Sequence, residues 1–174
     1  MNQKLKKDNS SENTLYNKIL LLSRNKIFYT KFKLSDTFQN RIHLIFIHIS
    51  FLLIKIKENK QNISHKVFYQ RLFDLIFYKI ELNMREIGYG DVTINKNMKL
   101  LVKNFYNILL KIERYNKLNI KNKEILLIEY LKHINTGKYH NYEELIDYFD
   151  KYGAFCFDLS SNSVLKGSLN FNYK

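Results

Sequence analysis

The chain has 174 residues, a formal net charge of +13, 45% hydrophobic and 15% aromatic content, five glycines and no proline. Its length and apolar content support one core and argue against two domains. The lack of proline favours long helices, so the composition predicts an all-α fold. The positive charge indicates an anionic partner such as RNA, the ribosome or an acidic lipid surface.

The single cysteine, Cys156, excludes a disulfide framework and is typical of a reducing compartment. Its two phenylalanine neighbours favour a buried apolar role over a nucleophilic one. The N-terminus is polar with mixed charge and resembles neither a secretory signal nor a transit peptide. We therefore expect the protein to stay on the cytoplasmic side.

We divide the chain into three parts. Residues 1–10 are predicted to be a disordered basic tail, and residues 11–153 a single bundle-like domain of about six helices. In residues 154–174, apolar residues alternate around turn-forming residues. This pattern favours a small hairpin or an extended strap on the helices.

Basic and aromatic residues alternate in RNKIFYTKFK, residues 24–33. Aromatic side chains of this kind stack on bases in single-strand binders, so a nucleic-acid surface is one hypothesis. The interpretation that we favour is a connecting segment whose aromatics fold inward, because the pattern is short and unrepeated.

A helix capped by Ser35 follows, and its middle is apolar nearly all round, which predicts a central core helix. The uncharged run from Ile42 to Ile54 is thirteen residues long, whereas a membrane span needs about 20. His43 and His48 lie five residues apart, which does not suit two helical ligands of one metal ion. We predict hydrogen-bonded core histidines; a haem ligand is the alternative.

A second long helix, capped by Ser64, ends at a glycine turn. We expect Gly88 to adopt the left-handed conformation that ends a helix, and Gly90 to provide a second permissive position. Arg85 is placed to pair with Glu81 four residues earlier. The predicted inner stripe of this helix comprises Tyr69, Phe73, Ile76, Ile80, Met84 and Ile87.

The helix after the turn, capped by Asp91 or Thr93, is expected to extend roughly 33 Å. Opposite its apolar stripe runs a basic face of Lys96, Lys99, Lys103, Lys111 and Arg114. Between Ile94 and Lys123 there are eight basic residues and one acid. We predict that this face meets the ribosome or an anionic membrane.

Two further helices are predicted. The first spans Asn119 to Asn135, and its predicted inner face is Ile125, Ile128, Leu131 and Ile134. The second begins at Asn141 and ends at Gly153. Its predicted inner face is Tyr142, Leu145, Ile146, Phe149 and Tyr152, and its outer face is Glu143, Glu144, Asp147 and Asp150.

The blocks LFDLIF, LNMREIGYGD and NKNMKLLVKNFYN resemble the ubiquinol–cytochrome c chaperone family, the assembly factors of respiratory complex III. The family pattern falls on Leu72, Phe73, Asp74, Arg85, Glu86, Gly88, Gly90, Asp91, Met98, Lys99, Phe105 and Tyr106. A weaker resemblance extends from about Tyr16 to Leu118 and includes His48. The chain departs from the pattern at Glu81, Met84, Asn107 and Ile108. The last two replace a Gly-Arg pair, so no contact through that arginine is expected.

The resemblance implies a non-enzymatic chaperone that binds newly made cytochrome b, and from the residues themselves we predict no metal and no cofactor. It also implies a small co-chaperone subunit and a peripheral place on the inner membrane, on the matrix side in an organelle. It places partner binding in a signature region of Phe73, Asp74, Arg85, Glu86, Gly88, Tyr89, Gly90 and Asp91.

The sequence contains no phosphate-binding glycine loop, nucleophile elbow or histidine cluster, so we predict a binding protein rather than an enzyme. Two alternatives stay open. One is an RNA- or ribosome-binding helical protein that uses the basic helix at residues 94–123 and KIFYTKFK. The other is an enzyme acting on a lipid or isoprenoid at the membrane surface, with His48 or Asp74 as the reacting group.

Overall fold

The computed structural model describes residues 10–57, 62–134 and 142–173. These ranges contain helices and no β-strand, which confirms the all-α prediction. Two of the helices are single turns, leaving six longer ones, as expected. The elements are α1 (Ser11–Ser23), α2 (Ile27–Thr30), α3 (Phe38–Lys57), α4 (Ile63–Glu86), α5 (Asp91–Ile112), a 3-10 helix (Tyr115–Lys117), α6 (Ile120–Tyr130), α7 (Glu143–Asp158) and α8 (Ser161–Leu165). The predicted basic tail lies outside the described residues except for Ser10.

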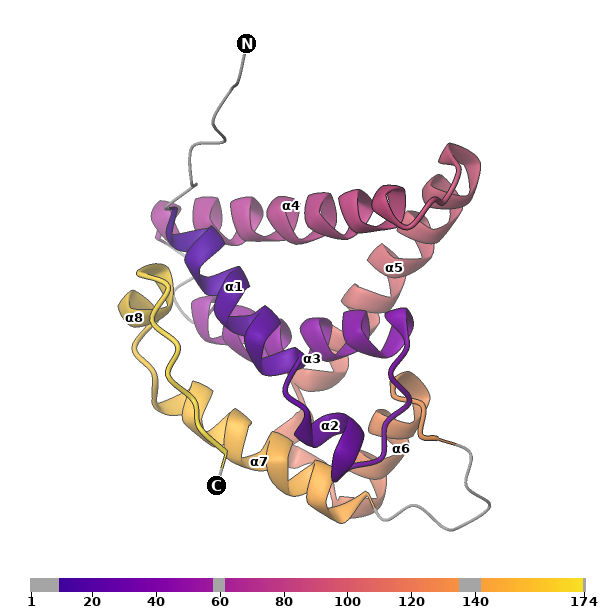
Figure 1. The fold of residues 1–174 in the computed structure, drawn as a ribbon. Helices are drawn as coiled ribbons and strands as arrows, with labels where there is room; N and C mark the ends of the chain where they lie inside the picture. Colours follow the sequence, from indigo (N-terminus) through magenta and orange to yellow (C-terminus); the bar gives the residue numbers. More distant parts are fainter. Residues whose placement is uncertain (1–9, 58–61, 135–141, 174) are drawn as a thin grey trace.

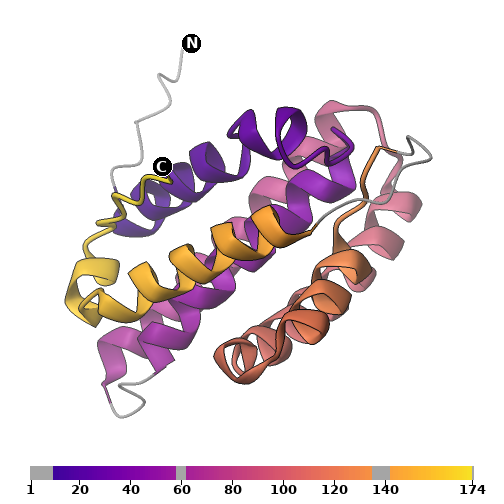
Figure 2. The same cartoon turned by 90° about the horizontal axis from the view of Figure 1, so that it is seen from below.

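Helix α3 forms the centre of the fold. Its residues are buried on every side from Ile42 to Leu53, as the sequence predicts for a core helix. Helices α1, α4, α5 and α7 pack around it (Figures 1 and 2). In the described part of the chain, no helix combines the length and apolar character that crossing a membrane requires.

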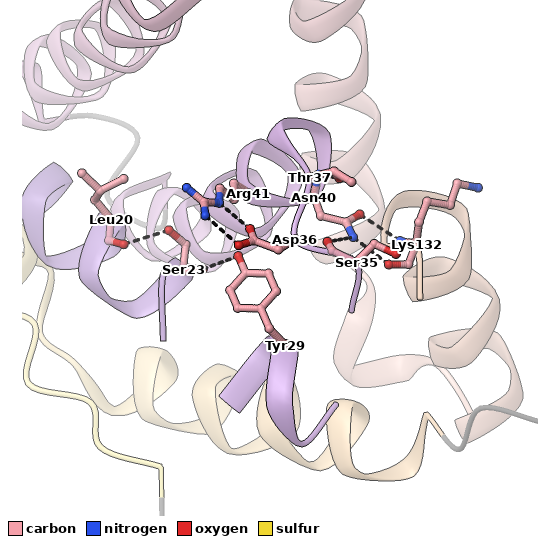
Figure 3. Close-up of polar contacts among 9 residues, drawn as sticks. All are labelled: Leu20, Ser23, Tyr29, Ser35, Asp36, Thr37, Asn40, Arg41 and Lys132. Atoms are coloured by element: carbon pink, nitrogen blue, oxygen red, sulfur yellow. Dashed lines mark hydrogen bonds and ion pairs between the residues drawn. The ribbon is translucent and has the colours of Figure 1, made fainter. Parts of the chain in front are cut away.

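Asn40, in the first turn of α3, joins two connecting segments to the core. Its side-chain amide donates to the carbonyl oxygens of Ser35 and Lys132 at 2.7 and 2.6 Å. Its side-chain oxygen accepts from the Lys132 amide at 2.9 Å (Figure 3). Because Asn40 is fully buried, these bonds satisfy groups that would otherwise destabilise the fold. Next to it, Arg41 forms a two-point ion pair with Asp36, at 2.6 and 2.8 Å.

The two histidines of α3 are hydrogen-bonded core residues. His48 is fully buried; its Nδ1 donates to the Leu44 carbonyl at 2.6 Å and its Nε2 accepts from the Tyr148 hydroxyl at 2.8 Å. His43 Nδ1 donates to the Tyr130 carbonyl at 2.7 Å, and Gln39 donates to its Nε2 at 2.8 Å. Both rings are thus engaged at both nitrogens, which favours the structural role over the haem-ligand alternative.

The aromatic side chains of residues 24–33 point inward, as we favoured. Phe28 and Phe32 are buried, and both pack edge-to-face against Tyr148 of α7. Tyr29 is half-buried, and its hydroxyl donates to the Ser23 carbonyl at 3.4 Å (Figure 3). The phenylalanine rings of this segment are therefore buried in the core and are not available for the base stacking that the nucleic-acid hypothesis requires.

Helix α7 continues past Gly153 to Asp158, so the prediction that Gly153 ends it is wrong. A Cβ atom at Gly153 would lie 2.9 Å from the Phe51 ring, so the glycine allows α7 to approach α3 closely. The inner face predicted for α7 is confirmed, since Tyr142, Leu145, Ile146, Phe149 and Tyr152 are buried.

The extended strap predicted for residues 154–174 occurs only at residues 168–173, because residues 154–158 continue α7 and residues 161–165 form α8. After α8, Gly167 has a φ of +70° and stands against α1, where a Cβ would lie 2.8 Å from the Ser11 carbonyl oxygen. Residues 168–173 then run without helix or strand along α7, and the described residues there form no hairpin. Phe171 contacts the rings of Tyr148 and Tyr152, which fastens the strap to the bundle.

Helix α6 is shorter than predicted and presents a different face to the core. It ends at Tyr130, and residues 135–141 lie outside the described residues. Of the predicted inner face only Leu131 is buried, whereas Ile125, Ile128 and Ile134 are exposed. Leu126, Leu127 and Tyr130 fill the core instead. The error arises because residues 131–134 leave the helix to form the bridge between Leu34 and His133.

Several predicted caps are displaced by a residue or more. Thr37 rather than Ser35 accepts from an amide at the start of α3, and Asn62 rather than Ser64 caps α4. The cap of α5 is Gly90, which offers no side chain, rather than Asp91 or Thr93. Asn119, predicted from the sequence as the first residue of this helix, is its N-cap.

We predict that Gly153→Ala lowers the free energy of unfolding by about 1–2 kcal/mol, because the added methyl overpacks the Phe51 ring. Alanine in an α-helix is otherwise favoured over glycine by about 1 kcal/mol. Chemical denaturation of a double-mutant cycle with Phe51→Leu would separate the two effects. In the Phe51→Leu background Gly153→Ala should become neutral or stabilising; equal destabilisation in both backgrounds would contradict the packing explanation.

The buried His48 should make the protein less stable in acid. Burial lowers the pKa of His48 to about 4, whereas an unfolded histidine titrates near its ordinary value. As the pH falls below about 6.5, the unfolded chain binds the proton first, so stability declines until about pH 4, by about 3 kcal/mol in total. Denaturation at pH 7 and pH 4.5 should show a smaller decline for His48→Gln. The same decline in both proteins would exclude His48 as its source.

Candidate partner-binding surface

The turn between α4 and α5 ends helix α4 with the backbone hydrogen bonds that are usual at a glycine C-cap. The Tyr89 amide donates to the Met84 carbonyl and the Gly88 amide to the Arg85 carbonyl, both at 3.0 Å. Gly88 has a φ of +91°, which confirms the predicted left-handed residue. Gly90, in contrast, has an extended conformation that any residue adopts, so the prediction of a second permissive position is wrong.

Arg85 connects the two helices across this turn. Its Nη2 lies 2.8 Å from a Glu81 oxygen, as the spacing predicts, and its Nη1 lies 2.6 Å from an Asp91 oxygen. The hydrogen bonds to Glu81 and Asp91 raise the pKa of Arg85. Asp91 also stands in the first turn of α5, where the helix dipole favours a negative charge. These contacts hold the turn in one conformation.

Three apolar side chains project from the braced turn. Ile87, Tyr89 and Val92 are 58%, 41% and 85% exposed, and we call this group the turn apex. The sequence places Ile87 on the inner stripe of α4, but the helix ends at Glu86 and the side chain points to solvent. Ile87 and Val92 are therefore candidate contact residues that sequence reasoning missed, because apolar periodicity does not show which residues stay uncovered.

Not all residues of the signature region gather at the turn. Asp74 lies eleven residues before Arg85 on α4, roughly 16 Å away along the helix axis. It is exposed and accepts a hydrogen bond from Gln70 at 2.8 Å. Phe73 is half-buried and packs against the rings of Phe77 and Phe105. Both residues therefore belong to the body of α4 and not to the turn.

Glu86 connects the turn to a narrow groove. The groove has a volume of about 190 Å³ and lies between α1, α3 and the end of α4. Ile42 and Ile80 contribute to its apolar floor, and Arg24 and Arg41 stand at its edge. The turn apex thus adjoins a hollow that has both apolar and charged walls.

The predicted basic face is only partly free. Lys111 forms an ion pair with Glu129 of α6, and its ammonium lies 5.2 Å from the Tyr130 ring centre. Lys96, Lys99 and Lys103 are exposed and form no ion pair with the described residues. Arg114 is exposed beyond the end of α5 and lines a groove next to α6. The exposed positive charge of this face therefore lies at Lys96, Lys99 and Lys103, with Arg114 beyond the end of the helix.

The two residues proposed for an enzymatic alternative are poorly placed for chemistry. His48 is fully buried and both of its ring nitrogens are hydrogen-bonded. Asp74 stands on the exposed surface of a helix, beside Gln70. Within the described ranges no group of three metal-ligating side chains occurs. Neither His48 nor Asp74 is therefore placed as the reacting group that the enzymatic alternative requires.

The fold and this surface define a small all-α, bundle-like protein with an exposed apolar turn. A sequence comparison matches residues 30–117, just over half of the chain, to the ubiquinol–cytochrome c chaperone family. The chain belongs to this family, as its motifs suggested. It is also similar in fold to the crystal structure of the Cbp3 homolog from Brucella abortus, with 21% sequence identity and a TM-score of 0.77 over 94% of this chain and 89% of that one. No curated protein sequence matches it.

We predict that Arg85→Gln loosens the turn without unfolding the protein. Loss of the two carboxylate contacts should speed amide hydrogen exchange at residues 88–91, because local opening there becomes easier. The thermal midpoint should change little, since both ion pairs are exposed. Arg71→Gln is a matched control, because the contact of Arg71 with Glu12 is long, at 3.9 Å. Equal exchange in both variants would show that Arg85 does not hold the turn.

Proposed function

We propose that this protein is a non-enzymatic assembly chaperone that binds newly made cytochrome b during the biogenesis of respiratory complex III. The observation that carries the proposal is the turn apex, an exposed apolar group held in place by Arg85. Membership of the ubiquinol–cytochrome c chaperone family supports a client of this kind.

The chemistry of the turn apex suits a membrane-protein client. Segments of such a client are apolar and must be shielded from water before they are assembled. Ile87 and Val92 present branched aliphatic groups, and Tyr89 adds a ring with a polar end. Because the turn is already ordered, little conformational entropy is lost when the client binds.

The groove beside the apex extends this surface. Its apolar floor would accept a side chain that follows the residues held at the apex. Arg24 at the edge would bind a carboxylate of the client segment, and Glu86 would exclude a second one. We infer that the client segment enters along the end of α4 and passes over Gly88.

The proposed setting follows from this client. A chaperone of cytochrome b works where that subunit enters the membrane, so we place the protein peripherally at the inner membrane, on the cytoplasmic side or on the matrix side in an organelle. A small co-chaperone subunit is a further proposed partner. The exposed part of α4 offers room for it, with Tyr78 60% exposed.

The proposal is tested by a tagged pull-down from solubilised membranes of the native host, scored for cytochrome b. Ile87→Gln with Val92→Gln should reduce recovery at least tenfold, since two exposed apolar contacts are each worth about 1 kcal/mol or more when buried. Ile63→Gln is the matched control, because Ile63 is 76% exposed at the first residue of α4, at the opposite end of that helix from the turn. Circular dichroism should be the same for all three proteins. If the apex variant recovers as much cytochrome b as the native protein, the turn apex is not the client contact.

A further inference from the structure

We propose that the outer face of α5 docks onto the surface of an anionic lipid bilayer. This outer face consists of Lys96, Lys99, Leu100, Lys103 and Leu110. The inference goes beyond the proposed binding of a client at the turn apex and does not depend on it.

The first argument is the placement of charge. At 100° per residue, the five residues of the outer face occupy less than half of the circumference of α5. Between the first and last of them the helix contains no acidic residue. Asp91, the one acid of α5, is held by Arg85 at 2.6 Å. The three lysines therefore act together on a negatively charged surface.

The second argument is the exposure of two leucines among these lysines. Leu100 is 53% exposed and Leu110 is 60% exposed, and they lie about 15 Å apart along the helix axis. Exposed aliphatic side chains contribute little to binding RNA, whose outer surface is phosphate and ribose. At a lipid interface they enter the acyl region while the lysine ammonium groups reach the headgroup phosphates. The mixture therefore favours lipid over nucleic acid.

The surroundings of Leu110 extend the apolar part of this surface. A groove of about 490 Å³ runs between the end of α5 and α6, and Leu118 and Ile125 line it together with Leu110. Arg114 stands at the same groove and adds a further positive charge. In Figure 1 the start of α5 lies at the right-hand edge of the molecule and the rest of the helix runs behind α3.

Sedimentation with vesicles of phosphatidylcholine, with and without phosphatidylglycerol, tests the electrostatic part. The native protein should bind the acidic vesicles and bind pure phosphatidylcholine weakly. Lys99→Gln with Lys103→Gln should lower partitioning about 25-fold, at about fivefold for each lysine near the surface. Lys26→Gln with Lys166→Gln removes two exposed lysines elsewhere and should change partitioning much less. Equal losses in the two double variants would overturn the assignment to α5.

The leucines distinguish lipid from nucleic acid. Leu100→Gln with Leu110→Gln should reduce partitioning to acidic vesicles about tenfold, or about threefold for each leucine, because only part of each side chain becomes buried. The same variant should bind ribosomal RNA as the native protein does. Circular dichroism and Leu21→Gln control for folding and for loss of any exposed leucine. If the leucine variant binds vesicles like the native protein, and RNA binding depends on Lys99 and Lys103, the partner of the outer face is nucleic acid and not lipid.

Discussion

The complete burial of α3 is the constraint on which the rest of the structure depends. A helix that is apolar on all sides cannot face solvent, so neighbouring helices must cover it on every side. Its few polar side chains then need partners inside the protein. Asn40 is bonded to two connecting segments, His43 to the end of α6 and His48 to α7. The polar side chains of α3 are costly to bury, and the hydrogen bonds that satisfy them also position the surrounding elements.

Close packing on α3 explains features that look unfavourable locally. Gly153 weakens α7 as a helix, yet it lets the Phe51 ring lie against the α7 backbone. The strap at residues 168–173 has no regular hydrogen bonding, yet its rings cover Tyr148 and Tyr152, which hold His48. In both cases tertiary contacts with α3 and its partners offset a poor local preference.

The same packing separates the two proposed binding surfaces. Helices α4 and α5 bury their inner faces against α3 and meet at the turn, away from the centre of the fold (Figure 1). The turn apex is apolar and braced by one arginine, which suits an apolar client segment. The outer face of α5 combines lysines with leucines, which suits a charged interface. A chaperone with both surfaces would hold its client close to the membrane that receives it.

The sequence alone determined the helices of the core, the left-handed Gly88, the pairing of Arg85 with Glu81 and the family, because these depend on local spacing and on motif residues. Only the tertiary structure decided which apolar residues are covered. Ile87, Ile125 and Ile128 satisfy a helical apolar pattern as well as Ile80 does, yet they are exposed, while Gly153 is buried inside a helix that it was expected to end. The reason is physical: burial depends on the element that packs opposite a side chain, and periodicity within one helix carries no record of that neighbour.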